Sequence, residues 1–111
     1  MDKLENYRKI VQSLLLEYAG YKPANGDIEN EVVFDTAGDH YQLLSIGWEG
    51  IHRVFGCIFH IDIKDGKIWV QHDSTDVGIA NELVNSGVPK EDIVLAFHAP
   101  HRRKHTGFAV A

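Results

Sequence analysis

Three histidines near the C-terminal end are spaced like metal ligands. His98, His101 and His105 follow the pattern H-x2-H-x3-H, and three imidazoles can bind zinc and leave one position open for water. Pro100, however, interrupts the continuous helix that would align the three rings, and a short histidine-rich tract is only a compositional hint. We therefore expect no metal or other cofactor. If the protein were nevertheless a metal-dependent hydrolase, these three histidines would be its candidate ligands. The alternative is a solvated basic loop.

The same segment carries three adjacent cations, Arg102, Arg103 and Lys104. All sixteen acidic residues lie at or before position 92, and eight basic residues leave residues 1–97 with a net charge of −8, whereas residues 98–111 carry +3. An acidic body repels nucleic acid at long range, so only this segment would attract DNA, with an affinity that falls steeply with salt. The alternative is a solvated basic surface, or pairing with the protein's own acids.

A third set of polar residues lies on and beyond a predicted β-hairpin. A histidine within reach of carboxylates can act as a general acid or base, but it needs a cleft, and polar cross-strand pairs on a solvent-facing sheet are far more common. Cys57 has no evident histidine partner, so we interpret it as a small buried hydrophobic residue. We predict no catalytic residue. The set comprises His60, Asp62, Trp69 and Gln71, followed by Asp73 and Asp76.

The hairpin that positions these residues is predicted by the Asp65-Gly66 pair between residues 58–63 and 68–73. Asp-Gly between two strand-like runs is a strong hairpin signal, because both residues tolerate positive φ. A two-residue turn fixes the register and gives the sheet an apolar and a polar face. The apolar pairs are Ile63 with Ile68, Ile61 with Val70 and Phe59 with His72, and the polar pairs are Asp62 with Trp69 and His60 with Gln71.

The other elements complete an α+β pattern. Apolar residues at spacings of three and four predict a helix over residues 2–19, with Asp2 as N-cap and Gly20 as its end. Residues 20–30 are expected to form a loop, and strands are predicted over residues 31–35, 40–48, 51–63 and 68–72, which together make a four-stranded antiparallel meander.

A second helix is predicted after the capping residues 73–76, ending at Gly87. Residues 93–97 are predicted to form a short buried strand, and the apolar tail 106–111 should dock on the body or on a partner. We expect one α+β domain over residues 1–111, with the helices on one face of the sheet.

Composition limits the setting. The 111 residues suit a single domain, one cysteine excludes an internal disulfide, and no apolar run approaches the roughly 20 residues of a membrane span. The first residues show no signal-peptide pattern. These features predict a cytoplasmic protein that does not insert into membranes.

Six blocks of this sequence carry a family resemblance: M-D-K-L-x-x-Y-R (residues 1–8), G-W-E-G-x-x-R-V-x-G (47–56), D-I-K-D-G-K-I-W-V-Q-H-D-S-T-D (62–76), I-A-N-E-L-V (79–84), G-V-P-K-E-D-I-V-L-A-F-H (87–98) and T-G-F-A-V-A (106–111). Together they resemble the XisI family, whose members are named as factors controlling excision of the fdxN element. This DNA segment is removed from the cyanobacterial chromosome during heterocyst differentiation. The resemblance covers nearly the whole chain but offers no catalytic residues to carry over, and His72 departs from the usual pattern.

The resemblance implies a regulatory role beside a site-specific recombinase and an XisH-like companion protein. An acidic one-domain chain suits a non-enzymatic accessory that binds a protein partner, and we expect it to form a homo-oligomer as well. Aromatic side chains often anchor interfaces, so Trp48, Trp69 and Phe108 are candidate partner contacts. A DNA-binding accessory that uses Arg102, Arg103 and Lys104 is the alternative, and a metal-dependent hydrolase is a third.

Overall fold

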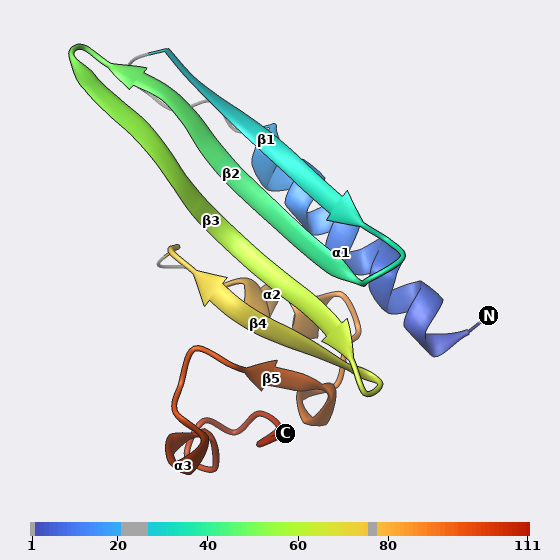
Figure 1. The fold of residues 1–111 in the computed structure, drawn as a ribbon. Coiled ribbons are helices and arrows are strands. Elements are labelled where there is room, and N and C mark those ends of the chain that lie inside the picture. The colour runs from blue at the N-terminus through green and yellow to red at the C-terminus, as the bar shows by residue number, and fades with distance from the viewer. Residues whose placement is uncertain (1, 21–26, 76–77) are drawn as a thin grey trace.

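Two helices pack on one side of a five-stranded sheet in the computed structural model, which describes residues 2–20, 27–75 and 78–111 (Figure 1). The strands lie in the order β1-β2-β3-β4-β5; the first four are antiparallel, and β5 runs parallel to β4. The predicted α+β meander is confirmed, and β5 extends it by one strand. The elements are α1 (Lys3–Ala19), β1 (Asp27–Asp35), β2 (His40–Glu49), β3 (His52–Lys64), β4 (Lys67–Asp73), α2 (Ile79–Asn85), the 3-10 turn η1 (Lys90–Asp92), β5 (Ile93–Leu95) and α3 (Pro100–Arg103).

Helix α1 forms as its sequence predicts. The Asp2 carboxylate accepts a hydrogen bond from the Leu4 backbone N–H at 3.2 Å, which satisfies one of the free donors at the helix start. The apolar stripe turns toward the sheet, and Val11 and Leu15 are fully buried. Gly20 caps the other end, where its N–H donates to the carbonyls of Leu16 and Glu17.

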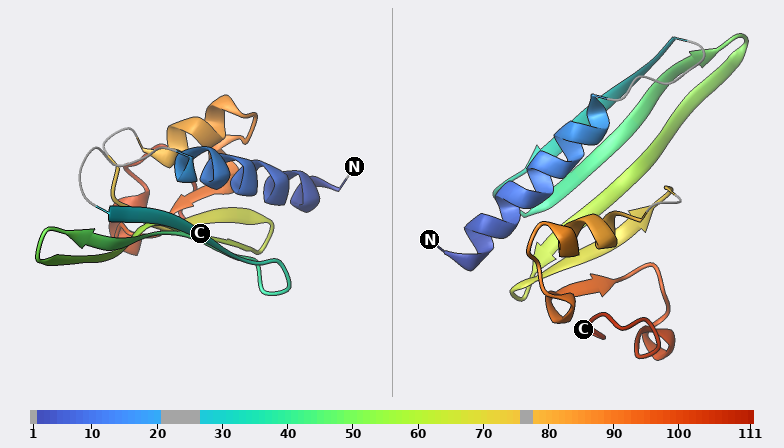
Figure 2. Two further views of the ribbon diagram at one scale, coloured as in Figure 1. Left: turned by 90° about the horizontal axis from the view of Figure 1, so that it is seen from above. Right: turned by 180° about the vertical axis from the view of Figure 1, so that it is seen from behind.

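One hydrophobic core lies between the sheet and the two longer helices. α1 and α2 cover the same face of the sheet, as predicted (Figure 2, left). This face, called the inner face below, contributes fully buried side chains such as Tyr41, Leu43 and Phe59. The Tyr18 ring from α1 meets the Phe59 ring edge-on, with centroids 5.0 Å apart. The opposite, outer face of β1, β2 and β3 is not covered by α1 or α2.

The β3–β4 hairpin turns at Asp65 and Gly66, which adopt φ values of 54° and 77°. Two consecutive positive φ values define a turn that matches the twist of the strands. Beyond the turn, three predicted pairs are confirmed, but a β-bulge then shifts the register. His60 faces His72 and Phe59 faces Asp73, so the predicted pairs His60–Gln71 and Phe59–His72 are wrong. The bulge moves His72 to the outer face.

Three boundaries differ from the prediction. β1 begins at Asp27 rather than residue 31, because the long β2 supplies backbone partners as far as Trp48. The β5 strand ends at Leu95, two residues earlier than expected. Helix α2 begins only at Ile79, and the predicted cap Asp76 lies outside the described residues. Gly78 occupies the N-cap position, and Asp73 satisfies the first helical donor instead, since its Oδ2 accepts from the Ile79 N–H at 2.7 Å.

The C-terminal tail docks on the body of the protein, one of the two outcomes expected for it. Ala109 forms a parallel bridge to Val94 of β5, and its N–H donates to the Ile93 carbonyl at 2.9 Å. The Phe108 side chain packs against the core. The tail therefore protects the β5 edge of the sheet, whereas β1 remains an edge at the other side.

The far end of the β2–β3 hairpin projects beyond β4 and α2 (Figures 1 and 2). β4 pairs with β3 only from Phe59 onward, so residues 44–57 and the start of β1 lie beyond its reach. We call residues 27–31 and 44–57 the arm. Within the described part of the chain, no helix has both the length and the apolarity needed to cross a membrane.

Candidate functional site

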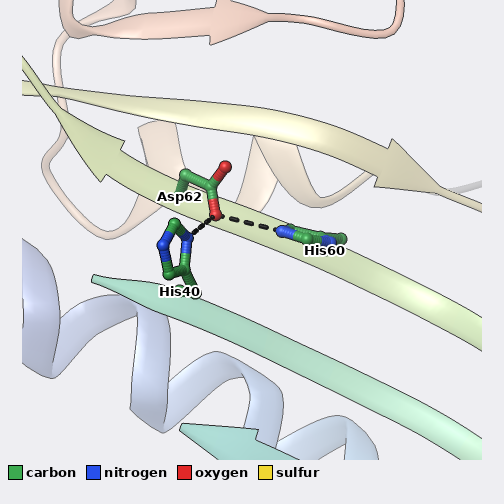
Figure 3. Close-up of side chains that lie close together, drawn as sticks. All are labelled: His40, His60 and Asp62. Atoms are coloured by element: carbon green, nitrogen blue, oxygen red, sulfur yellow. Dashed lines mark hydrogen bonds and ion pairs between the residues drawn. The ribbon is translucent and has the colours of Figure 1, made fainter. Parts of the chain in front are cut away.

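Two histidines and an aspartate converge on the outer face of the sheet (Figure 3). Asp62 Oδ1 lies 2.7 Å from His40 Nδ1 and 3.0 Å from His60 Nε2. The side chains of His40, His60 and Asp62 are 56%, 31% and 17% exposed, so the cluster is open to solvent on one side. We call these three residues the His–Asp cluster.

Strand pairing explains why these side chains meet. His40 on β2 lies directly opposite Asp62 on β3, and His60 lies two residues before Asp62 on the same face. A bulge at Ile58 shifts the β2–β3 register by one residue. Without it His40 would face Ile61, whose side chain points into the core, and the cluster would not form.

Two glutamines hold the cluster from either side. Gln42 Nε2 lies 3.0 Å from His60 Nδ1, and Gln71 Nε2 donates to Asp62 Oδ2 at 3.2 Å. The hydrogen bond to Asp62 raises the pKa of His40, because the carboxylate stabilises the imidazolium. The arrangement is suited to holding a proton between the groups or to holding a cation in their place.

An ion pair anchors α1 next to the cluster. Arg8 donates to both carboxylate oxygens of Asp39, at 2.8 and 3.1 Å, and the Tyr41 hydroxyl donates to Asp39 Oδ1 at 2.9 Å. The hydrogen bonds from Arg8 and Tyr41 lower the pKa of Asp39, although burial opposes this effect. Burial and the hydrogen bond to Asp39 raise the pKa of Tyr41 to about 12. Asp39 directly precedes His40, so this contact fixes the chain where the cluster begins.

The sequence-predicted histidine set is not brought together. Among the described residues, the only three His, Cys, Asp or Glu side chains with donor atoms mutually within 4.8 Å are those of the His–Asp cluster. α3 starts at Pro100, so His98 precedes the helix, His101 lies in its first turn and His105 follows its end. His98 and His105 line a pocket of about 560 Å³ with Leu95, Arg102 and Thr106, and the His101 side chain is exposed.

The basic segment divides into one structural and two exposed cations. Arg103 donates to the carbonyls of His98, Ala96 and Val110, at 3.0, 3.3 and 3.4 Å, and so ties α3 to the tail. The side chains of Arg102 and Lys104 are exposed. Arg103 is therefore a poor candidate for a phosphate contact, because its guanidinium is already held by the protein.

The three predicted partner-contact aromatics lie in different surroundings. Trp48 on the arm is 49% exposed, with the Arg53 guanidinium 5.3 Å from its ring. Trp69 is half-buried beneath Lys64, whose Nζ lies 4.1 Å from the ring, and its indole N–H donates to the Lys64 carbonyl. Phe108 is half-buried against the core. Only Trp48 presents a large exposed surface.

Besides the predicted Trp48, the arm carries two exposed apolar residues that sequence reasoning missed, Phe55 and Ile51. Phe55 is 69% exposed and lies on β3 directly opposite Ile46, on the outer face. Ile46 and Trp48 lie two residues apart on β2 and so share this face. Ile51, at the hairpin turn, is 89% exposed. We call Leu44, Ile46, Trp48 and Phe55 the outer patch. Alternation along residues 40–48 already predicts Leu44, Ile46 and Trp48 on one face, and the structure confirms it. Only the structure places Phe55 beside them and shows that α1 and α2 leave this face uncovered (Figure 2).

Cys57 also differs from its prediction. Its side chain is half-buried on the outer face opposite Leu44, and its thiol donates to the Phe59 carbonyl at 3.0 Å. Burial raises the pKa of this thiol, so the thiolate is scarce near neutral pH.

Comparison with known proteins agrees with this architecture. The family model described as XisI protein matches residues 1–110. A crystallised XisI-like protein from Anabaena variabilis is 44% identical, with a TM-score of 0.90 over 99% of this chain and 100% of that one. The fdxN element excision controlling factor XisI from the same organism is 36% identical, with a TM-score of 0.84 and the same coverage. No curated protein sequence matches significantly. The resemblance in the sequence blocks is thus confirmed over the length of the fold, and the chain belongs to the XisI family.

Proposed function

We propose that this chain is a non-enzymatic accessory protein that controls excision of a DNA element, and that it acts by binding a partner protein through the outer patch. The observation that carries the proposal is the exposed apolar surface of the arm, where Trp48 and Phe55 remain 49% and 69% exposed. Exposed aromatic residues grouped on one face are typical of protein interfaces. A structural relative is named as an excision controlling factor, which supports the biological setting.

The charge around the patch favours a protein partner over DNA. Asp27, Glu29 and Glu31 on β1 are exposed and share the outer face with the patch, since their cross-strand partners are Trp48, Ile46 and Leu44. Carboxylates beside an interface repel phosphates and attract basic side chains. We therefore expect the partner to present an apolar surface with lysines or arginines at its edge. An XisH-like companion is the first partner to test, and a site-specific recombinase the second.

Co-purification tests this proposal. The chain is expressed with a tagged XisH-type companion, and the eluate is analysed by size exclusion with light scattering. Phe55→Glu places a charge in the outer patch and should abolish the complex. Leu16→Glu is the matched control, because Leu16 is 54% exposed on α1 and lies on the other side of the molecule. A complex that survives Phe55→Glu and Trp48→Glu would contradict the proposed surface.

Two further outcomes would assign the surface differently. Light scattering of the chain alone would reveal a homodimer. Loss of that dimer in Phe55→Glu would show that the outer patch binds a second copy of the chain. Salt-sensitive binding to double-stranded DNA that disappears in Arg102→Ala/Lys104→Ala would favour the DNA-binding alternative, because such binding rests on phosphate contacts.

A further inference from the structure

The His–Asp cluster has the donor set of a metal centre. It presents two imidazole nitrogens and one carboxylate oxygen, all within 4.8 Å of one another. Ligand atoms about 2.0–2.2 Å from a shared cation lie roughly 2.8–3.6 Å apart when the angles are near 90–110°. The separations of 2.7 and 3.0 Å between Asp62 Oδ1 and the two ring nitrogens are already close to that range. Small side-chain rotations would therefore admit an ion.

We propose that His40, His60 and Asp62 form a binding site for a divalent transition-metal ion of the Zn²⁺, Co²⁺ or Ni²⁺ class. Mixed imidazole and carboxylate ligands favour these ions over Mg²⁺ and Ca²⁺, which prefer shells of oxygen alone. This inference goes beyond the proposed function, since it concerns a different set of residues and needs no partner protein.

The surroundings of the cluster resemble those of a metal site. Metal-bound imidazoles usually hydrogen-bond through their second nitrogen, and ligating carboxylates are themselves held by neighbours. Gln42 lies 3.0 Å from His60 Nδ1, and Gln71 donates to Asp62 Oδ2 at 3.2 Å. When a metal binds His60 Nε2, the ring proton moves to Nδ1, and Gln42 accepts it by presenting its amide oxygen instead of its nitrogen.

The site is accessible to solvent, and its backbone is held in place by the sheet. His40 and Asp62 are direct cross-strand partners at the end of the β2–β3 ladder, and the Ile63 N–H donates to the Asp39 carbonyl at 3.0 Å, so backbone hydrogen bonds fix this end of the pair of strands. The His40 side chain is 56% exposed, so an ion can enter from the outer face without any movement of the core. Water completes the coordination on the open side, which makes this a three-ligand site with free positions.

The test is metal binding by the full chain, purified with a tag that contains no histidine and treated with chelator. Zn²⁺ is titrated by calorimetry, and Co²⁺ by its visible absorption. We expect one ion per chain, with binding that weakens as the pH is lowered because protons compete with the metal for the imidazoles. Gln71→Leu should lower the affinity about tenfold, as outer-shell changes do. His60→Ala and Asp62→Asn should lower it further.

Matched histidine variants locate the ion. His52 is exposed at the start of β3, far along the strand from the cluster, so His52→Ala should bind as the parent does. His72 is exposed directly opposite His60. If His72→Ala and His60→Ala each lower the affinity for Zn²⁺, the ion still lies at this site. Unchanged binding in both His60→Ala and Asp62→Asn, with folding verified by circular dichroism, would overturn the proposal. So would the absence of a saturable site.

Discussion

Two phenylalanines on the same strand provide the sharpest test of how this sheet presents its faces. Phe59 and Phe55 both lie on β3, four residues apart, yet Phe59 is fully buried and Phe55 is 69% exposed. The bulge at Ile58 separates them, so they point to opposite faces. Replacing each by alanine removes the same atoms from the same strand. Any difference in the free energy of unfolding therefore reports the burial of the ring.

The expected magnitudes follow from burial. Phe59→Ala leaves a cavity in the core and removes the edge-on contact with Tyr18, and such truncations cost about 3–5 kcal/mol. Burying a phenylalanine completely is worth about 1.5–3 kcal/mol. Phe55 buries only about a third of its surface in this chain, so Phe55→Ala should cost about 0.5–1 kcal/mol on the same scale.

Urea unfolding followed by circular dichroism measures both values, at two protein concentrations tenfold apart. We expect a small effect for Phe55→Ala at the lower concentration. If Phe55→Ala destabilised the protein as much as Phe59→Ala, the reasoning from burial would be refuted. A large effect that also grew with protein concentration would show that Phe55 is buried against a second copy.

Three other predictions concern individual side chains. Asp39→Asn should destabilise the protein at pH 7, and the difference from the parent should shrink as the pH falls below about 4. Asp39 has a lowered pKa when folded, so its contribution is complete above the unfolded carboxyl value of about 3.9 and is lost as pH falls through the folded value. Urea midpoints at pH 7, 4 and 3 measure this, and a constant difference would contradict it. Asp73→Ala should lower the free energy of unfolding in urea by about 2 kcal/mol, because Asp73 accepts from both the Ile79 N–H and the Thr75 N–H. A decrease of less than about 0.5 kcal/mol would contradict this, since it would mean that water replaces both hydrogen bonds. Cys57 should react more slowly with a disulfide reagent at pH 8 in the folded chain than in urea, since partial burial raises the pKa of its thiol. Equal rates would show that the fold does not shield the half-buried thiol.

Much of the architecture could be read from local patterns. The apolar stripe of α1, the Asp-Gly turn and the alternation along β2 each depend on residues close together in the chain, and each is confirmed. The Gly87 stop signal also holds: Gly87 adopts φ 104°, and the Val88 N–H donates to the Leu83 carbonyl beyond it. The parallel pairing of β5 with β4 was not predicted, because it joins strands separated by a helix and depends on how that helix packs.

The sequence by itself determined which residues alternate between faces and where the chain turns, because those properties depend on φ preferences and on a period of two. It also carried the family resemblance. The candidate site was decided by tertiary structure. One extra residue at Ile58 shifts the β2–β3 register and places His40 opposite Asp62, and another at Gln71 brings His72 opposite His60. Sequence patterns do not specify such bulges, since their cost is offset by packing in the assembled core.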